Sequence, residues 1–140
     1  MTDEEKLKQI SGDWISSYKK TKLLTGAKLL IGRIATIISV LVVPSILFLS
    51  LPPLTKIEGS GVAIIVLIVS VIFSVKLAPK YSSYSELVSG LEKERDLFIA
   101  KKPPYAEKNA NTLFVIKNKK HISDSYSVTG DVPDNFTAEL

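Results

Sequence analysis

The sequence contains no cysteine and only one histidine among its 140 residues. Without cysteine, a disulfide scaffold, a zinc ribbon and a thiol enzyme are excluded. His121 has no acidic or cysteine neighbour at the spacing of a metal site, so it is predicted to be a surface side chain. Serine and lysine pairs such as Ser16 and Lys19 lack the further motifs of acyl-transfer enzymes. We therefore expect a protein that is not an enzyme and holds no cofactor or metal.

Charge is missing from two long stretches, residues 34–55 and 59–75, although 23% of all residues are charged. Residues 34–51 contain twelve Ile, Val, Leu or Phe, and as a helix they would be about 27 Å long, close to the roughly 30 Å core of a bilayer. Residues 62–75 contain eleven such residues, and a span over residues 60–78 includes the stem of a lysine that can reach the headgroups. The pattern predicts two transmembrane helices.

Two alternatives to this prediction are weaker. A β-strand of fourteen apolar residues would be roughly 46 Å long, far beyond the usual strand. Two buried core helices that are apolar on every side would need more surrounding protein than 140 residues supply.

A short loop over residues 51–61 is predicted to join the spans, because Pro52 and Pro53 stop the first helix and Gly59 and Gly61 permit a turn. Seven Lys or Arg precede the first span, ten follow the loop, and the loop itself has only Lys56. By the positive-inside rule, both termini are expected in the cytoplasm. Basic and aromatic residues do not alternate as in a protein that stacks nucleic-acid bases, so no nucleic-acid partner is expected.

The parts outside the spans are predicted to be helical. Residues 1–33 form an amphipathic helix with Thr2 or Asp3 as its cap. Residues 79–126 hold a long helix that begins after a kink or entry turn at Pro79 and ends at Pro103, then a short helix over residues 111–126 capped by Asn111 or Thr112. Residues 92–96 are charged and are predicted to be a solvated face. Residues 127–140 are polar and contain Gly and Pro, so a disordered tail is predicted.

Apolar and aromatic residues at helical spacing predict that these helices pack on one another. The predicted packing residues are Trp14, Tyr18, Tyr84, Leu87, Leu91, Phe98, Tyr105 and Phe114. An interfacial aromatic belt is the alternative for Trp14 and Tyr18, but Trp14 lies about 20 residues before the span. The fold class is therefore all-α, an integral membrane helical hairpin with an N-terminal amphipathic helix and C-terminal cytosolic helices.

Within the spans, small and hydroxylated residues recur on one face of each helix. They are Gly32, Thr36, Ser39 and Ser50 on the first helix, and Ser60, Ala63, Ser70 and Ser74 on the second. Such residues let helix backbones approach in lipid. The stripe is either a packing seam or the lining of a narrow pore, and a pore requires several copies of the hairpin. Pro44 frees a carbonyl in the first span and is a candidate kink or gate.

The order of these segments resembles the SLATT superfamily of two-transmembrane domains, in a bacterial branch labelled only as a domain of unknown function. The resemblance is carried by Trp14 and Tyr18 with the lysines that follow them, and by the run LEKERDLFIAKKPPYAEKNANTLFV over residues 91–115. Within this run, Glu92, Glu94, Arg95 and Phe98 are followed by the break at Pro104, Tyr105 and Ala106.

This resemblance implies a prokaryotic protein of the inner cell membrane that acts as an oligomeric pore-forming or membrane-perturbing effector. Its cytosolic helices would gate the spans. The chain carries no fused sensor, so a separate sensor or nucleotide-synthesising protein would be the partner. The alternative function is a non-conducting membrane anchor that recruits a cytosolic partner.

Overall fold

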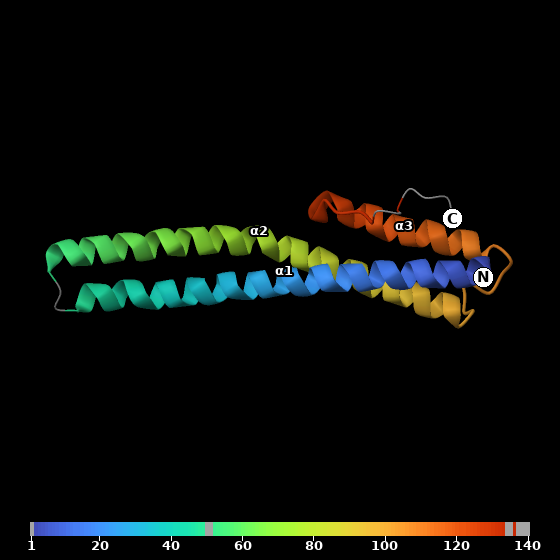
Figure 1. Cartoon of the computed structure of the whole chain (residues 1–140), viewed down its shortest axis with the longest axis horizontal. Helices are drawn as coiled ribbons and strands as arrows, with labels where there is room; N and C mark the ends of the chain where they lie inside the picture. The colour runs from blue at the N-terminus through green and yellow to red at the C-terminus, as the bar shows by residue number, and fades with distance from the viewer. Residues whose placement is uncertain (1, 50–51, 134–135, 137–140) are drawn as a thin grey trace. The chain divides into compact units, whose positions relative to one another are not determined.

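The computed structural model describes residues 2–49, 52–133 and 136, and its regular elements are three α-helices. They are α1 (Asp3–Phe48), α2 (Pro53–Ile99) and α3 (Ala110–Thr129), as Figure 1 shows. The chain divides into two units: the hairpin unit, residues 24–81, and the three-helix unit, residues 1–23 and 82–140. The all-α prediction is confirmed for the described residues, and α1 and α2 are long and apolar enough to cross a membrane.

A capping box starts α1. The backbone N–H of Thr2 donates to the Glu5 carboxylate at 2.9 Å, and the N–H of Glu5 donates to Thr2 Oγ1 at 3.3 Å. Two backbone donors of the first turn are thereby satisfied. The helix then continues through the predicted amphipathic segment and the first span to Phe48, and Pro44 lies inside it without ending it.

The predicted loop over residues 51–61 is too long. Because α2 begins at Pro53, both Gly59 and Gly61 lie inside the helix. Proline suits the first turn of a helix, where its missing N–H would have no partner, so Pro53 begins a helix rather than a turn. Pro79 also lies inside α2, so no entry turn occurs there.

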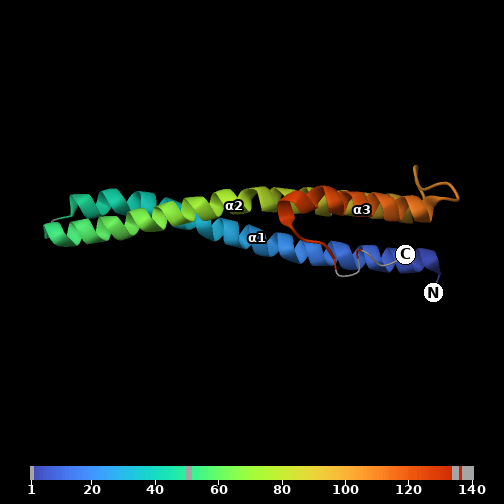
Figure 2. The ribbon, with the colours of Figure 1, turned by 90° about the horizontal axis from the view of Figure 1, so that it is seen from above.

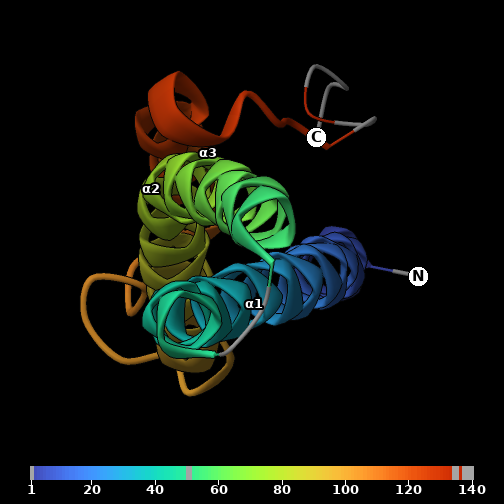
Figure 3. The same cartoon turned by 90° about the vertical axis from the view of Figure 1, so that its left-hand side faces the viewer.

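Buried and half-buried positions follow one another at steps of three and four along both long helices. In α1 they include Leu7, Ser11, Trp14, Tyr18, Thr25, Leu29, Gly32, Thr36, Ser39, Val43 and Ile46. In α2 they include Ser60, Ala63, Leu67, Ser70, Ser74, Leu77, Tyr81, Tyr84, Val88, Leu91, Arg95 and Phe98. This spacing is the repeat by which two helices pack in a left-handed coiled coil. Figure 3 views the hairpin unit along its helices and shows α1 and α2 side by side.

In the three-helix unit, α3 lies alongside α2 (Figure 2), and the two helices approach closely at Gly90. A Cβ added to Gly90 would lie 2.9 Å from His121 Nδ1, so a larger residue would push the helices apart. The predicted short helix is confirmed, but it begins at Ala110, and Asn109, not Asn111 or Thr112, occupies the N-cap position.

The end of α3 lies later than predicted. Residues 127–129, assigned to a disordered tail, are its last turn, and Gly130 follows with φ 64° and donates its N–H to the Tyr126 carbonyl at 2.8 Å. This left-handed residue is a common helix terminator because glycine adopts it without steric cost. The rest of the predicted tail lies outside the described residues, apart from residues 131–133 and 136.

Candidate functional site

The small and hydroxylated residues predicted from the sequence line the contact between α1 and α2 in the hairpin unit. We call this set the hydroxyl seam: Gly32, Thr36, Ser39, Ser60, Ala63, Ser70 and Ser74. Ser39 and Ser70 are 5% and 6% exposed, Gly32 and Ala63 are buried, and the other three are half-buried. Ser50, the remaining predicted member, lies outside the described residues.

The two helices approach each other closely at Gly32. A Cβ placed on this glycine would lie 2.8 Å from Ser74 Oγ and 3.0 Å from a ring carbon of Phe73. Small residues permit such an approach, and the close contact replaces the hydrophobic driving force that helices lack in lipid. At Gly61, in contrast, an added Cβ would meet nothing within 4 Å.

Hydroxyl groups along the two helices differ in how they are satisfied. Thr36 Oγ1 donates to the Gly32 carbonyl at 2.9 Å, and Ser70 Oγ donates to the Val66 carbonyl of its own helix. The hydroxyls of Ser60 and Ser74 are buried and have no hydrogen-bond partner. An unpartnered buried hydroxyl costs free energy, so these two groups would gain from contact with water.

The outer surface of the hairpin unit is more apolar than its interior. Of the 30 large hydrophobic side chains that are exposed among the described residues, 24 lie within residues 24–81. A water-soluble helix pair has the reverse arrangement, with its apolar side chains inside. The hairpin unit therefore has the polarity of a helix pair whose solvent is apolar.

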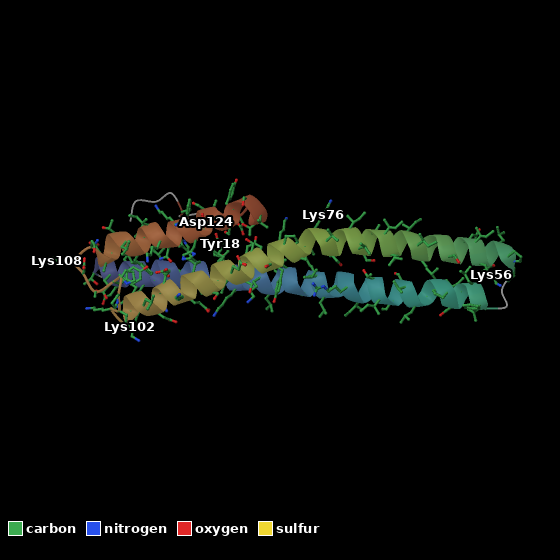
Figure 4. The ribbon with its side chains drawn as sticks, turned by 180° about the vertical axis from the view of Figure 1, so that it is seen from behind. Tyr18, Lys56, Lys76, Lys102, Lys108 and Asp124 are labelled. Atoms are coloured by element: carbon green, nitrogen blue, oxygen red, sulfur yellow. The ribbon has the colours of Figure 1, made fainter. Side chains whose placement is uncertain are left out.

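Charged residues lie only near the two ends of the hairpin unit. Lys56 and Glu58 lie at the end near the connection between the helices, and Lys76 and Lys80 of α2 with Lys28 and Arg33 of α1 lie toward the other end (Figure 4 labels Lys56 and Lys76). Lys56 and Lys76 are 20 residues apart, which is about 30 Å along a helix. This distance matches the hydrocarbon core of a bilayer.

All eight packing residues predicted from the sequence are buried in the three-helix unit, in two clusters. Trp14, Tyr18, Tyr84, Leu87 and Leu91 belong to one cluster with Ile15, Val88 and Ile122. Phe98, Tyr105 and Phe114 form the other with Leu7. The Phe98 and Phe114 rings stack with centroids 4.1 Å apart, and Tyr105 meets both rings edge-on.

One polar group inside this unit was missed by the sequence prediction. The Glu94 carboxylate accepts a hydrogen bond from the Tyr105 hydroxyl and lies 3.6 Å from His121 Nε2. Burial of the phenol raises the pKa of Tyr105, and its hydrogen bond to Glu94 raises it further. His121 therefore has an acidic neighbour, contrary to the sequence-based expectation, and Glu94 does not lie on a solvated face, because its side chain is only 13% exposed.

A helical-spacing argument would have placed Glu94 correctly. It lies three residues after Leu91 and four before Phe98, so all three share one face of α2. His121 lies three residues after Asn118 and seven after Phe114, both buried on α3. That the two faces meet depends on α3 folding back, which no local pattern specifies.

Raising the pH from 10 to 12 is expected to destabilise the three-helix unit. The Tyr84 hydroxyl donates to Asp131 at 3.2 Å, and burial, with the Asp131 charge, raises the pKa of Tyr84 from 10.0 to about 12. The stabilisation from the neutral phenol is thus complete below pH 10 and lost as the pH rises through 12. Fluorescence of Trp14, the only tryptophan, measures unfolding. Tyr84→Phe should reduce this alkaline loss, whereas Tyr126→Phe, at a 52% exposed position, should leave it unchanged.

Asn118→Leu is expected to stabilise the three-helix unit by about 1–2 kcal/mol. Asn118 is 2% exposed in α3, and its side-chain oxygen has no hydrogen-bond partner. Leucine of similar size removes the unsatisfied oxygen and adds apolar burial. Urea unfolding followed by Trp14 fluorescence measures the change, and a lower midpoint for the leucine variant would contradict it.

An open groove of 670 Å³ on the three-helix unit is lined by Gly12, Ser16, Lys19, Lys20, Glu92 and Arg95, among others. Lys19 forms an ion pair with Glu92, and Arg95 Nε donates to the Lys8 carbonyl at 3.5 Å. Two of the groove's cations are therefore already partnered by the protein.

Within the part of the chain that the structure describes, no three His, Asp or Glu residues lie close enough together to hold a metal ion. The arrangement offers a closed polar seam inside an apolar hairpin and an aromatic core in a separate unit. No family model matches the chain, and neither does any curated protein or solved structure.

Proposed function

We propose that this chain is a two-span membrane protein whose hairpin unit crosses the bilayer with both termini in the cytoplasm. The observation that carries the proposal is the reversed polarity of the hairpin unit, with hydroxyls inside and 24 large apolar side chains outside. The charge-free stretch between Glu58 and Lys76, which are 18 residues or about 27 Å apart along α2, supports it. The excess of basic residues near the ends of the chain supports a cytoplasmic location for both termini.

Its function in the membrane is to act as an oligomeric pore-forming effector. The hydroxyl seam is closed within one hairpin, and when several hairpins assemble and open, the seam would turn toward water and line the pore. The unpartnered hydroxyls of Ser60 and Ser74 favour this opening, because water would satisfy them. Residues 91–115, through their resemblance to the SLATT superfamily, support an effector role triggered by a separate sensor or nucleotide-synthesising partner.

A disulfide across the seam tests this function. The chain has no cysteine, so Gly32→Cys with Ser74→Cys introduces the only two thiols. These positions are close enough for a disulfide, since a Cβ on Gly32 would lie 2.8 Å from Ser74 Oγ. In liposomes, the reduced variant should release an entrapped dye, the oxidised variant should not, and a reductant should restore release. Each single-cysteine variant is the control.

Leakage that continues when the seam is bridged would contradict the opening of the hairpin. Absence of leakage from the unmodified protein, with and without nucleotide ligands, would favour the second function, a non-conducting anchor that recruits a cytosolic partner. The observation favouring an anchor is that the closed hairpin exposes an apolar face, while Thr36 and Ser70 already donate their hydroxyls to carbonyls of their own helices. An anchor should capture its partner equally well with the seam bridged.

A further inference from the structure

The hairpin unit has an apolar groove of 310 Å³ on one side of the contact between its helices. Ile31, Gly32 and Ala35 of α1 line it, together with Val66, Val69 and Phe73 of α2. Ser70 also lines it, but its hydroxyl donates to the Val66 carbonyl. Its volume lies near the lower limit of pockets that hold small molecules, about 300–1,000 Å³. Its lining on α2 extends over residues 65–73, about 12 Å along the helix.

All of the net charge of the chain resides in the hairpin unit. The formal charge is +4, and the hairpin unit has five basic residues and one acidic residue, Glu58. The three-helix unit has thirteen of each sign, so its net charge is zero. Four of the five cations lie toward one end of the hairpin unit, and all four are exposed.

Three of these four cations lie on the same side of the hairpin as the groove. Lys28 precedes Ile31 by three residues and Ala35 by seven, so the three share a face of α1. Lys76 and Lys80 follow Phe73 by three and seven residues on α2. Arg33, the fourth cation, is rotated about 140° from Lys28 around α1 and lies away from the groove.

We propose that this groove and its three lysines bind one anionic phospholipid, with an acyl chain in the groove and the headgroup phosphate at Lys28, Lys76 and Lys80. The proposal rests on the membrane insertion proposed above, but not on pore formation. The lysines provide the charge complementarity that an anionic headgroup requires, and the apolar lining suits an acyl chain.

A second copy of the chain fits this surface less well. A symmetric contact through the same groove would bring two sets of three lysines together at one end, and like charges repel. An uncharged lipid would fill the groove but leave the lysines without a partner. An anionic phospholipid satisfies both parts of the surface at once.

Native mass spectrometry of the full-length, delipidated protein in detergent tests the proposal. The probes are phosphatidylglycerol and phosphatidylcholine with the same acyl chains. We expect phosphatidylglycerol to bind at least tenfold more tightly. The double variant Lys28→Gln with Lys76→Gln should weaken its binding by about 30-fold, which corresponds to about 2 kcal/mol, since each lysine near an anionic headgroup contributes about 1 kcal/mol.

The matched control is Arg33→Gln with Lys56→Gln. It also removes two positive charges from the hairpin unit, but none of them from the groove side. This variant should keep the preference for phosphatidylglycerol. Ala35→Leu should fill the groove and weaken the binding of both lipids, whereas Ala27→Leu, at an exposed alanine of α1 that does not line the groove, should not.

Equal binding of the two lipids, or an equal loss in the two charge variants, would overturn the site. Inhibition by soluble glycerol phosphate as strong as that by the complete lipid would show an anion site without an acyl chain, and would also overturn it. Resistance of the protein to alkaline extraction from membranes is measured in parallel. Extraction would refute the proposed membrane insertion, whereas an inserted protein without lipid preference would refute only this inference.

Discussion

Phe114→Ala is expected to lower the free energy of unfolding of the three-helix unit by about 3–5 kcal/mol. Phe114 is 1% exposed, stacks on Phe98 with ring centroids 4.1 Å apart and meets the edge of Tyr105 at 5.8 Å. Truncation removes the transfer free energy of a buried ring, leaves a cavity and deletes two aromatic contacts. Because whole domains are stable by only about 5–15 kcal/mol, this loss should leave part of the unit unfolded.

Urea unfolding of the full-length protein in detergent, followed by Trp14 fluorescence, measures this loss. Trp14 is 4% exposed and lies in the other hydrophobic cluster, so a change at Phe114 reaches it only if the unit unfolds cooperatively. Ile116→Ala is the control, because Ile116 lies on the same helix and is 57% exposed. A shift for Phe114→Ala no larger than that of Ile116→Ala would show that α3 does not depend on this cluster.

The aromatic cluster also shows which features of the fold can be predicted from sequence. Phe98 and Phe114 were assigned to packing because each lies on the apolar face of a helix, a local property. Spacing places Glu94 on the same face of α2, but a carboxylate favours solvent, so spacing alone did not predict its burial. Its burial depends on the Tyr105 hydroxyl and on His121, which come from the following loop and from α3.

Boundaries near proline and glycine were the least predictable features of the hairpin. The sequence predicts a loop over residues 51–61, because Gly59 and Gly61 favour turns. In the structure Gly59 is half-buried in α2, and a Cβ on it would lie 3.4 Å from the Ile46 side chain, so it acts as a small residue at a helix contact. The same glycine signal thus has two meanings, and only the position of the neighbouring helix distinguishes them.

The position of the small-residue stripe on each span was predictable, because small residues recur there at steps of three and four. Ser39 and Ser70, from different helices, were both placed on the stripe, and both are buried in the hairpin unit. The sequence left open whether that stripe faces a helix or water. In the structure the stripe faces the other helix. Large apolar residues such as Leu30 and Val75 form the exposed surface of the hairpin unit.

Gly32→Leu is expected to weaken the pairing of α1 and α2 by about 1–3 kcal/mol, the usual cost of overpacking. A Cβ at this position already lies within 2.8 Å of Ser74 Oγ and 3.0 Å of the Phe73 ring. The serine hydroxyl can rotate away from a single carbon, but the longer leucine side chain must displace the ring or the helix. Gly61→Leu is the matched control, because an added Cβ there has nothing within 4 Å.

Spin labels at Leu30→Cys and Val75→Cys, which are 58% and 65% exposed on the two helices, report the pairing in lipid. Gly32→Leu should lengthen and broaden the distribution of distances between the labels, and Gly61→Leu should leave it unchanged. If opening of the seam forms the pore, Gly32→Leu should also increase dye release from liposomes, because the closed hairpin is the state it destabilises. Separated helices without increased dye release would refute the pore, because the hydroxyl seam would then be open without conducting. The anchor would remain as the proposed function.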